Sequence, residues 1–251
     1  MKALLCRAIS EDIGTPRLED VVLPPLGVDS VRVRVRAAAV NFPDLLMVQG
    51  KYQHKPELPF VLGGEFAGDV VQVGSLVDRF RIGDAVIASG FTGAFAEEAQ
   101  VSEAQLRPVP KGVDYATAAG FTLAYLTAYV SLVRRAELRE GEFLLVHGAA
   151  GGVGLAAVDL GKALGARVIA TASNETKRQF LLRYGADYVL PSEGFRESVK
   201  ALTAGRGADV IYDPVGGDAF DESTRCINFN GRLLVVGFAS GRIPSINANI
   251  P

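Results

Sequence analysis

Cysteine and histidine are scarce in this sequence, and their scarcity excludes several kinds of site. The 251 residues contain two cysteines, Cys6 and Cys226, and two histidines, His54 and His147. Two cysteines so far apart cannot form a disulfide framework or a thiolate zinc cluster, so we expect a reducing compartment and no thiolate-bound zinc. His147 ends an apolar run and is expected in the core, whereas His54 is expected in a surface loop.

A surplus of basic residues is also missing. The 26 Lys and Arg residues are balanced by 28 Asp and Glu residues, which gives a formal net charge of −2. Nucleic-acid-binding domains usually carry a basic surplus, so no nucleic-acid partner is expected. The N-terminal apolar run is too short for a signal peptide and soon meets Glu11 and Asp12, so we expect a cytoplasmic protein.

Only one stretch, residues 115–133, is free of charge over a length that could span a membrane. It carries several hydroxyl side chains, among them Thr122 and Ser131, which are costly in lipid. Gly120 interrupts it. The stretch therefore predicts a buried pair of helices broken at Gly120, and no membrane partner.

The first half of the chain predicts a β-rich domain. Residues 31–36 alternate valine and arginine, which is typical of a strand with one face on a core and one in water. Further strands are expected at 66–73, 84–89 and 94–101, separated by turn signals, and such spacing suggests a small barrel or sandwich. Residues 41–52 are expected to be irregular or weakly helical, and such segments on a rigid scaffold often carry binding residues.

From about residue 137, apolar runs alternate with helical patterns, which indicates βαβ units and a parallel sheet. Strands are expected at 143–147, 167–171, 186–190, 209–213 and 232–237, and helices at 152–164, 175–184, 195–203 and 219–228. The sequence thus predicts an α/β protein with two domains, residues 1–120 and 121–251.

Glycine is abundant, at 28 of 251 residues, and it clusters in one loop. Gly148, Gly151 and Gly154 follow one another at three-residue spacing between an expected strand and an expected helix. The first allows a tight turn, the second lets backbone approach a pyrophosphate, and the third permits close packing of the helix on the sheet. The loop predicts dinucleotide binding, and the alternative is a purely structural turn.

The end of the second strand predicts which nicotinamide cofactor is bound. An NAD site needs an acidic residue there for the ribose 2′-hydroxyl, and none is present. Ser173, Lys177 and Arg178 instead supply a hydroxyl and two cations for a 2′-phosphate, so NADPH is expected. The alternative is that both cations are solvated helix residues and that Glu175 compensates the helix dipole.

Several segments together resemble the medium-chain dehydrogenase/reductase superfamily, and within it the zinc-free quinone oxidoreductases related to zeta-crystallin. They are residues 41–44 (NFPD), 50–52 (GKY), 63–68 (GGEFAG), 127–129 (TAY) and 149–154 (AAGGVG). The resemblance implies an N-terminal GroES-like β-rich domain followed by a doubly wound, Rossmann dinucleotide-binding domain. It also implies metal-free chemistry, because Gly64 stands where the zinc enzymes of the superfamily have a histidine.

The resemblance implies roles for individual residues. Asn41 and Asp44 would line the place where nicotinamide and substrate meet. Tyr52 would be a proton donor or a substrate-orienting hydroxyl, and the alternative is that it only packs the pocket mouth. The cofactor-binding residues that the loop and the resemblance indicate are Phe42, Thr127, Gly148, Ala150, Gly151, Gly152, Val153, Gly154, Ser173, Lys177, Arg178, Val215, Gly216, Gly237 and Phe238.

The expected activity is NADPH-dependent, zinc-independent hydride transfer to a small quinone or another activated carbonyl or alkene. One alternative is an enoyl-thioester reductase, and another is a non-catalytic NADPH-binding protein of crystallin-like or regulatory use. The sequence ends after about the fifth parallel strand, whereas a complete doubly wound sheet has six. We therefore expect the family's C-terminal portion to be absent and a full-length form to be a homodimer.

Overall fold

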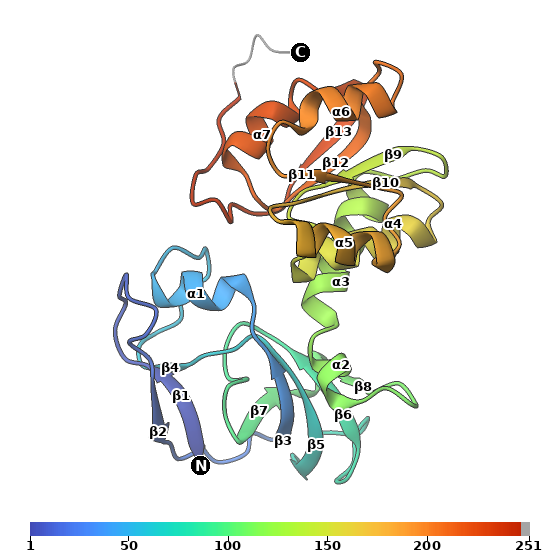
Figure 1. Cartoon of the computed structure of the whole chain (residues 1–251). Helices are drawn as coiled ribbons and strands as arrows, with labels where there is room; N and C mark the ends of the chain where they lie inside the picture. The colour runs from blue at the N-terminus through green and yellow to red at the C-terminus, as the bar shows by residue number, and fades with distance from the viewer. Residues whose placement is uncertain (247–251) are drawn as a thin grey trace. The chain divides into compact units, whose positions relative to one another are not determined.

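The computed structural model describes residues 1–246 and divides the chain into two compact units. The first unit comprises Met1–Leu123, and the second begins at Ala124, within helix α3 (Thr122–Tyr129). The boundary expected between residues 120 and 121 lies just before this division. Each unit has its own hydrophobic core, and Figure 1 shows the elements of both.

The first unit is built on two antiparallel sheets. The larger has the order β7-β3-β5-β6-β8, with β3 at Ser30–Ala39, β5 at Glu65–Val73, β6 at Ala85–Ser89, β7 at Glu98–Ser102 and β8 at Leu106–Pro108. The smaller has the order β2-β1-β4, with β1 at Lys2–Cys6, β2 at Arg17–Asp20 and β4 at Phe60–Val61. In β3, Val31 and Val33 are fully buried while Arg34 is exposed, so the alternating pattern is confirmed as a half-buried strand. The strand expected at 94–101 begins only at Glu98.

Short helices complete this unit. Helix α1 (Phe42–Val48) follows β3 and packs Met47 and Val48 on Cys6, Phe60 and other side chains of the smaller sheet. A 3₁₀ turn occupies Glu103–Gln105. Helix α2 (Tyr115–Ala119) packs on the larger sheet.

The charge-free stretch forms two helices with a break at Gly120, as predicted, but the pair is not buried throughout, because Leu126 is 56% and Tyr129 45% exposed. Helix α2 stops at Gly120, α3 follows, and a π-helical segment continues over Val130–Arg135. Ala124 and Ala128 of α3 lie in the core of the second unit. Within residues 1–246, no helix combines the length and the apolar character needed to cross a membrane.

The second unit is a parallel five-stranded sheet with helices on both faces (Figure 1). The strand order is β11-β10-β9-β12-β13, with β9 at Phe143–Val146, β10 at Arg167–Ala172, β11 at Tyr188–Pro191, β12 at Ala208–Asp213 and β13 at Ile227–Val235. The helices are α4 (Gly152–Ala163), α5 (Glu175–Tyr184), α6 (Phe195–Leu202) and α7 (Gly217–Ser223). Alternation along β9 places Leu144 in the core under α3, α4 and α5, and Leu145 in the core under α6. The predicted doubly wound arrangement is confirmed.

The helix expected before the last strand is longer than the one the structure contains. Residues 219–228 were expected to be helical, but α7 ends at Ser223 and β13 begins at Ile227. Ile227 pairs with Ala208 of β12, and a shift of register follows before Val210 pairs with Arg232. Asn230 in this irregular segment has a φ of +59°. Pairing with β12 therefore overrides the local helical pattern.

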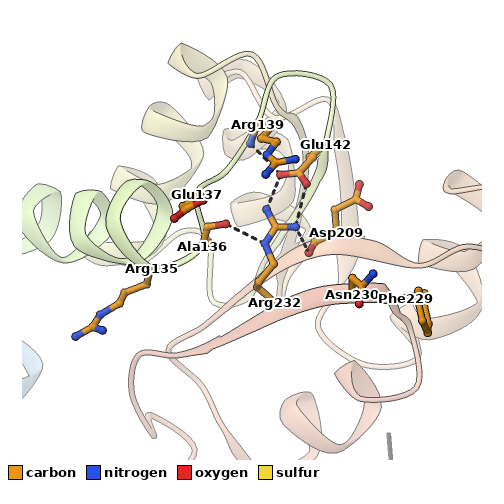
Figure 2. A pocket seen from close by; sticks show the side chains of 9 residues that line it. All are labelled: Arg135, Ala136, Glu137, Arg139, Glu142, Asp209, Phe229, Asn230 and Arg232. Carbon is orange, nitrogen blue, oxygen red and sulfur yellow. Dashed lines mark hydrogen bonds and ion pairs between the residues drawn. The ribbon is translucent and has the colours of Figure 1, made fainter.

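A cavity of about 440 Å³ lies near the amino ends of β9 and β12, away from the glycine-rich loop (Figure 2). Arg232 of β13 crosses it and pairs with both carboxylate oxygens of Glu142 at 2.7 and 2.9 Å. The same guanidinium donates to the carbonyls of Ala136 and Asp209. All three nitrogens of this guanidinium bind protein acceptors, so Arg232 joins β13 to the segment before β9.

Candidate functional site

The first group of candidate residues surrounds the start of α1. The side-chain amide of Asn41 donates to Glu65 at 2.9 Å, and the backbone N–H of Asn41 donates to Asp44 at 2.7 Å. The second oxygen of Glu65 accepts the backbone N–H of Leu123 at 2.8 Å. The structure thus places Asn41 and Asp44 together at the start of α1, and their expected role beside nicotinamide and substrate stays a prediction. Sequence reasoning missed Glu65, which orients Asn41; its only signal was its place in the GGEF segment.

The two carboxyl groups beside Asn41 are buried. Glu65 is 1% exposed and Asp44 is 4% exposed. Burial raises the pKa of Asp44, the hydrogen bond from the Asn41 N–H lowers it, and the charge of Glu65 raises it further. A carboxyl with a raised pKa close to an oriented amide can both accept and donate a proton, which suits a reaction that creates charge on an oxygen.

Tyr52 is half-buried, and its ring packs against the apolar cluster that contains Met47 and Phe60. Its hydroxyl forms no hydrogen bond with any side chain or backbone group of residues 1–246. The ring therefore has a packing role in this apolar cluster, and the hydroxyl stays available to a ligand. His54 is exposed, as expected, and stacks on Phe91 with the ring centroids 4.3 Å apart.

The side chains of this unit do not fit a zinc site. A catalytic zinc takes three protein ligands from cysteine, histidine and carboxylates. Across the part of the chain that the structure describes, no group of three or more such side chains is placed to hold a metal ion. Cys6 is buried and donates to the carbonyl of Ala8, and both oxygens of Glu65 accept N–H groups.

The second group of candidate residues is the loop between β9 and α4. Gly148 has a φ of +53°, which favours glycine, and a Cβ on Gly154 would lie 2.5 Å from the carbonyl oxygen of Gly148. Gly151 is the N-cap of α4 and no side chain caps the helix, so the first N–H groups of this twelve-residue helix, from Gly152 on, can bind an anion. The loop also contains the expected residues Ala150, Gly152 and Val153, and a Cβ on Gly152 would meet no atom within 4 Å. Backbone here can approach a phosphate closely.

Two cationic side chains, Lys177 and Arg178, lie in α5, the helix that follows β10. Arg178 donates to the carbonyl of Ala172, the last residue of β10, and pairs with Glu175 at 2.8 Å. Asn174 begins α5 by accepting the backbone N–H of Lys177. Lys177 is exposed and forms no ion pair within residues 1–246, while Ser173 is also exposed. The structure thus places Ser173 and Arg178 at the strand end, and shows a partner for Arg178 that sequence reasoning did not assign.

A turn after β12 completes this group. Asp213 ends β12 and accepts the N–H groups of Val215 and Gly216 at 2.8 and 2.9 Å, while its other oxygen has no partner among the described residues. Burial raises the pKa of this carboxyl, and the two N–H groups lower it. The Asp213 carbonyl also accepts the N–H of Gly237.

The turn approaches the glycine-rich loop closely. A Cβ on Gly148 would lie 3.1 Å from Val215, and a Cβ on Gly216 would lie 3.3 Å from the Phe238 ring. The expected cofactor residues of the second unit therefore lie at or just after the carboxyl ends of β9, β10, β12 and β13, apart from Thr127, which lies on α3. Phe42, in the first unit, is the first residue of α1 and is exposed. The Asp-Pro-Val-Gly-Gly sequence after an expected strand was the signal that could have revealed Asp213.

The sequence is similar to known protein families and to curated proteins. A family model described as zinc-binding dehydrogenase matches residues 152–250, and one described as alcohol dehydrogenase GroES-like domain matches residues 27–111. A quinone oxidoreductase-like protein 2 homologue of Nematostella vectensis is 45% identical over 231 residues, which are 90% of this chain and 62% of the relative. The quinone oxidoreductase of Pseudomonas aeruginosa is 41% identical over 229 residues, which are 89% of this chain and 70% of the relative.

Solved structures similar to this chain include a quinone oxidoreductase and an enoyl reductase. An Escherichia coli quinone oxidoreductase, solved in complex with NADPH, has a TM-score of 0.93 and 31% identity, and the match covers 100% of this chain and 77% of that one. The CurK enoyl reductase has a TM-score of 0.87 and 28% identity, over 94% of this chain and 74% of that one. The chain spans between 62% and 77% of the proteins named here. It belongs to the medium-chain dehydrogenase/reductase superfamily, within the quinone oxidoreductase-like group.

Proposed function

We propose that this protein binds NADPH and reduces a quinone by hydride transfer without a metal. One observation carries the proposal: the free N-terminus of α4, the open backbone at Gly152 and the cations after β10 gather at one edge of a parallel sheet. Anions bind at such helix ends, and dinucleotides bind at the carboxyl edge of such sheets.

The second unit would hold the cofactor. Gly152 and Val153 would bind the pyrophosphate through backbone N–H groups. The N–H of Gly151 donates to the Gly148 carbonyl at 2.9 Å, so Gly151 would contribute only the room that its missing side chain leaves. Ser173, Lys177 and Arg178 would bind the 2′-phosphate. Val215, Gly216, Gly237, Phe238 and Thr127 would lie against the ribose and nicotinamide. Bound NADPH would supply the hydride, and the chain's own residues would orient the acceptor.

The first unit would serve the acceptor. Asn41 can donate to or accept from an oxygen of the acceptor, because Glu65 holds its amide in one orientation. Asp44 and Tyr52 offer protons, one from a carboxyl with a raised pKa and one from a hydroxyl without a protein partner. A quinone needs no Lewis acid, since its own conjugation stabilises the anion that hydride addition creates.

Reduction of an enoyl thioester is the second candidate. It is supported by the likeness to the CurK enoyl reductase and by the free hydroxyl of Tyr52. Hydride addition to an enoyl thioester leaves an enolate whose α-carbon must be protonated, and this requires a positioned acid. The quinone oxygens can instead take protons from water.

The test is a panel of quinones and enoyl thioesters assayed for NADPH oxidation, with NADPH binding measured separately by calorimetry. We expect quinones to be reduced and activity to persist after dialysis against a chelator. Binding of NADPH without oxidation by any acceptor would favour a non-catalytic NADPH-binding protein. Loss of activity together with stoichiometric zinc would refute the metal-free mechanism.

A further inference from the structure

The interior of the second unit contains one fully buried imidazole, that of His147. The residue follows β9 directly and precedes Gly148, and its exposed fraction is 0%. Its Nδ1 lies 3.0 Å from the hydroxyl of Thr171, and its Nε2 lies 2.7 Å from the hydroxyl of Ser223. The ring packs on Phe195 at a centroid distance of 4.7 Å. Both ring nitrogens are therefore engaged.

These hydrogen bonds have a definite direction. The Ser223 hydroxyl donates its one hydrogen to the carbonyl of Ala219 at 2.6 Å, so toward His147 it can only accept. The Nε2 of His147 must then carry a hydrogen. Burial lowers the pKa of His147 to about 3, so the ring is neutral near pH 7 and its Nδ1 accepts from Thr171. The chain of bonds runs from Thr171 through His147 and Ser223 to Ala219.

Two of the linked residues adjoin segments that carry candidate cofactor residues, and the third lies in the helix that follows such a segment. His147 adjoins the glycine-rich loop, and its N–H donates to the carbonyl of Tyr212 in β12. Thr171 lies near the end of β10, and its carbonyl accepts the N–H of Ala149 in the loop. Ser223 lies in α7, which follows the turn after β12. The imidazole of His147, next to the glycine-rich loop, is thus hydrogen-bonded both to β10 and to α7.

We propose that His147, as the neutral Nε2–H tautomer, is a positioning residue for the dinucleotide site. It acts through the backbone of the glycine-rich loop and touches no ligand itself. The proposal rests on the proposed NADPH binding for its effect on affinity, whereas the tautomer and the direction of the bonds rest on the protein alone.

The tautomer can be measured directly because the chain has only two histidines. Nitrogen NMR of protein with ¹⁵N-labelled histidine, together with a His54→Gln variant for assignment, should show a protonated Nε2 and an unprotonated Nδ1 for His147. The pattern should persist from pH 8 to pH 5. A protonated Nδ1, or a protonated pair in this pH range, would overturn the proposal.

The positioning role is tested by a mutant cycle on NADPH affinity. Thr171→Val and Ser223→Ala each remove one hydroxyl, and His147→Leu removes both bonds of the ring. We expect each single variant to raise the Kd of NADPH by about threefold to tenfold or more, and the hydroxyl deletions to add little once His147 is replaced. Additive effects would mean that the three residues act separately, and would overturn the proposal.

Thr203→Val is the matched control. Thr203 is also buried and hydrogen-bonded in the second unit, but it follows α6 and precedes the amino end of β12. This variant should lower thermal stability and leave the Kd of NADPH unchanged. An equal loss of affinity in Thr203→Val would assign the effect to general destabilisation and refute a positioning role.

Two further outcomes separate this proposal from the proposed function. If the wild-type protein does not bind NADPH, the proposed function and the positioning role both fail, and the NMR result still decides the tautomer. If His147→Leu does not fold, Thr171→Val and Ser223→Ala still decide the positioning role. Unchanged affinity in both of these variants would overturn it.

Discussion

The carboxylate of Glu65 and the side-chain amide of Asn41 lie 2.9 Å apart and form a hydrogen bond. Asn41 is the N-cap of α1 and Glu65 is the first residue of β5, so the bond joins two elements that the chain brings together only on folding. Since the other oxygen of Glu65 accepts the Leu123 N–H, both oxygens of this buried group are occupied by N–H donors. Each carboxylate oxygen of Glu65 therefore accepts one hydrogen bond.

Glu65→Gln should disturb both stability and activity. The amide nitrogen of glutamine would face an N–H donor on one side, so one hydrogen bond is lost and a buried donor is left unpaired. This should cost roughly 1–3 kcal/mol in the free energy of unfolding and should lower kcat by releasing Asn41. Urea unfolding and steady-state kinetics measure the two effects. Glu57→Gln is the control, because Glu57 is exposed; a similar loss there would contradict the argument.

Glu175→Gln should strengthen the preference for NADPH. Glu175 pairs with Arg178 and adds a negative charge close to the proposed 2′-phosphate. Its removal should tighten NADPH binding roughly twofold to fivefold with little effect on NADH, because an exposed pair contributes modestly. Calorimetric Kd values for both cofactors measure this. Glu197→Gln, in the first turn of α6, is the matched control and should change neither value.

Lys177→Gln should have the opposite and larger effect. A charge-assisted contact to the 2′-phosphate would be lost, so the Kd of NADPH should rise more than about tenfold while that of NADH stays nearly constant. Equal losses for both cofactors, or tighter binding of NADH than of NADPH by the wild-type protein, would refute the proposed phosphate site.

Tyr52→Phe should distinguish the two acceptor classes. The variant keeps the ring that packs beside Met47 and removes only the free hydroxyl. Quinone reduction should stay within about tenfold of wild type, whereas enoyl-thioester reduction should fall by roughly two to four orders of magnitude. Turnover on both substrates decides the role. Unchanged enoyl reduction would leave Tyr52 a packing residue, and a large loss on quinones would make it an acceptor-orienting residue.

The buried His147 should make the protein less stable in mild acid. Unfolding restores its pKa from about 3 to 6.5, so below pH 6.5 the unfolded state binds more protons than the folded state. The free energy of unfolding should therefore fall as pH falls from 6.5 to 5, by up to about 1.4 kcal/mol for each pH unit. Thermal unfolding across this range measures it. His147→Leu should flatten the slope and the control His54→Gln should not; equal slopes in all three proteins would contradict the buried neutral ring.

Local sequence patterns were enough to predict most of the elements. Alternation in residues 31–36, the break at Gly120 and the glycine spacing at 148–154 each correspond to an element that the structure contains. These signals are short-range, because periodicity, helix ends and turn geometry depend on neighbours along the chain. The prediction for 219–228 failed because Ile227 pairs with Ala208 on a neighbouring strand, and no local pattern records that pairing.

The chemical groups of the candidate site can be read from the sequence: a glycine-rich loop, two cations after the second strand, and an asparagine and an aspartate near a tyrosine. Their hydrogen-bond partners follow from the folded packing. Asn41 meets Glu65 across 24 residues, and His147 meets Thr171 and Ser223 across 24 and 76 residues. Such bonds form between buried groups that lose their water on folding, so each partner is chosen by the packing of strands and helices and not by distance along the chain.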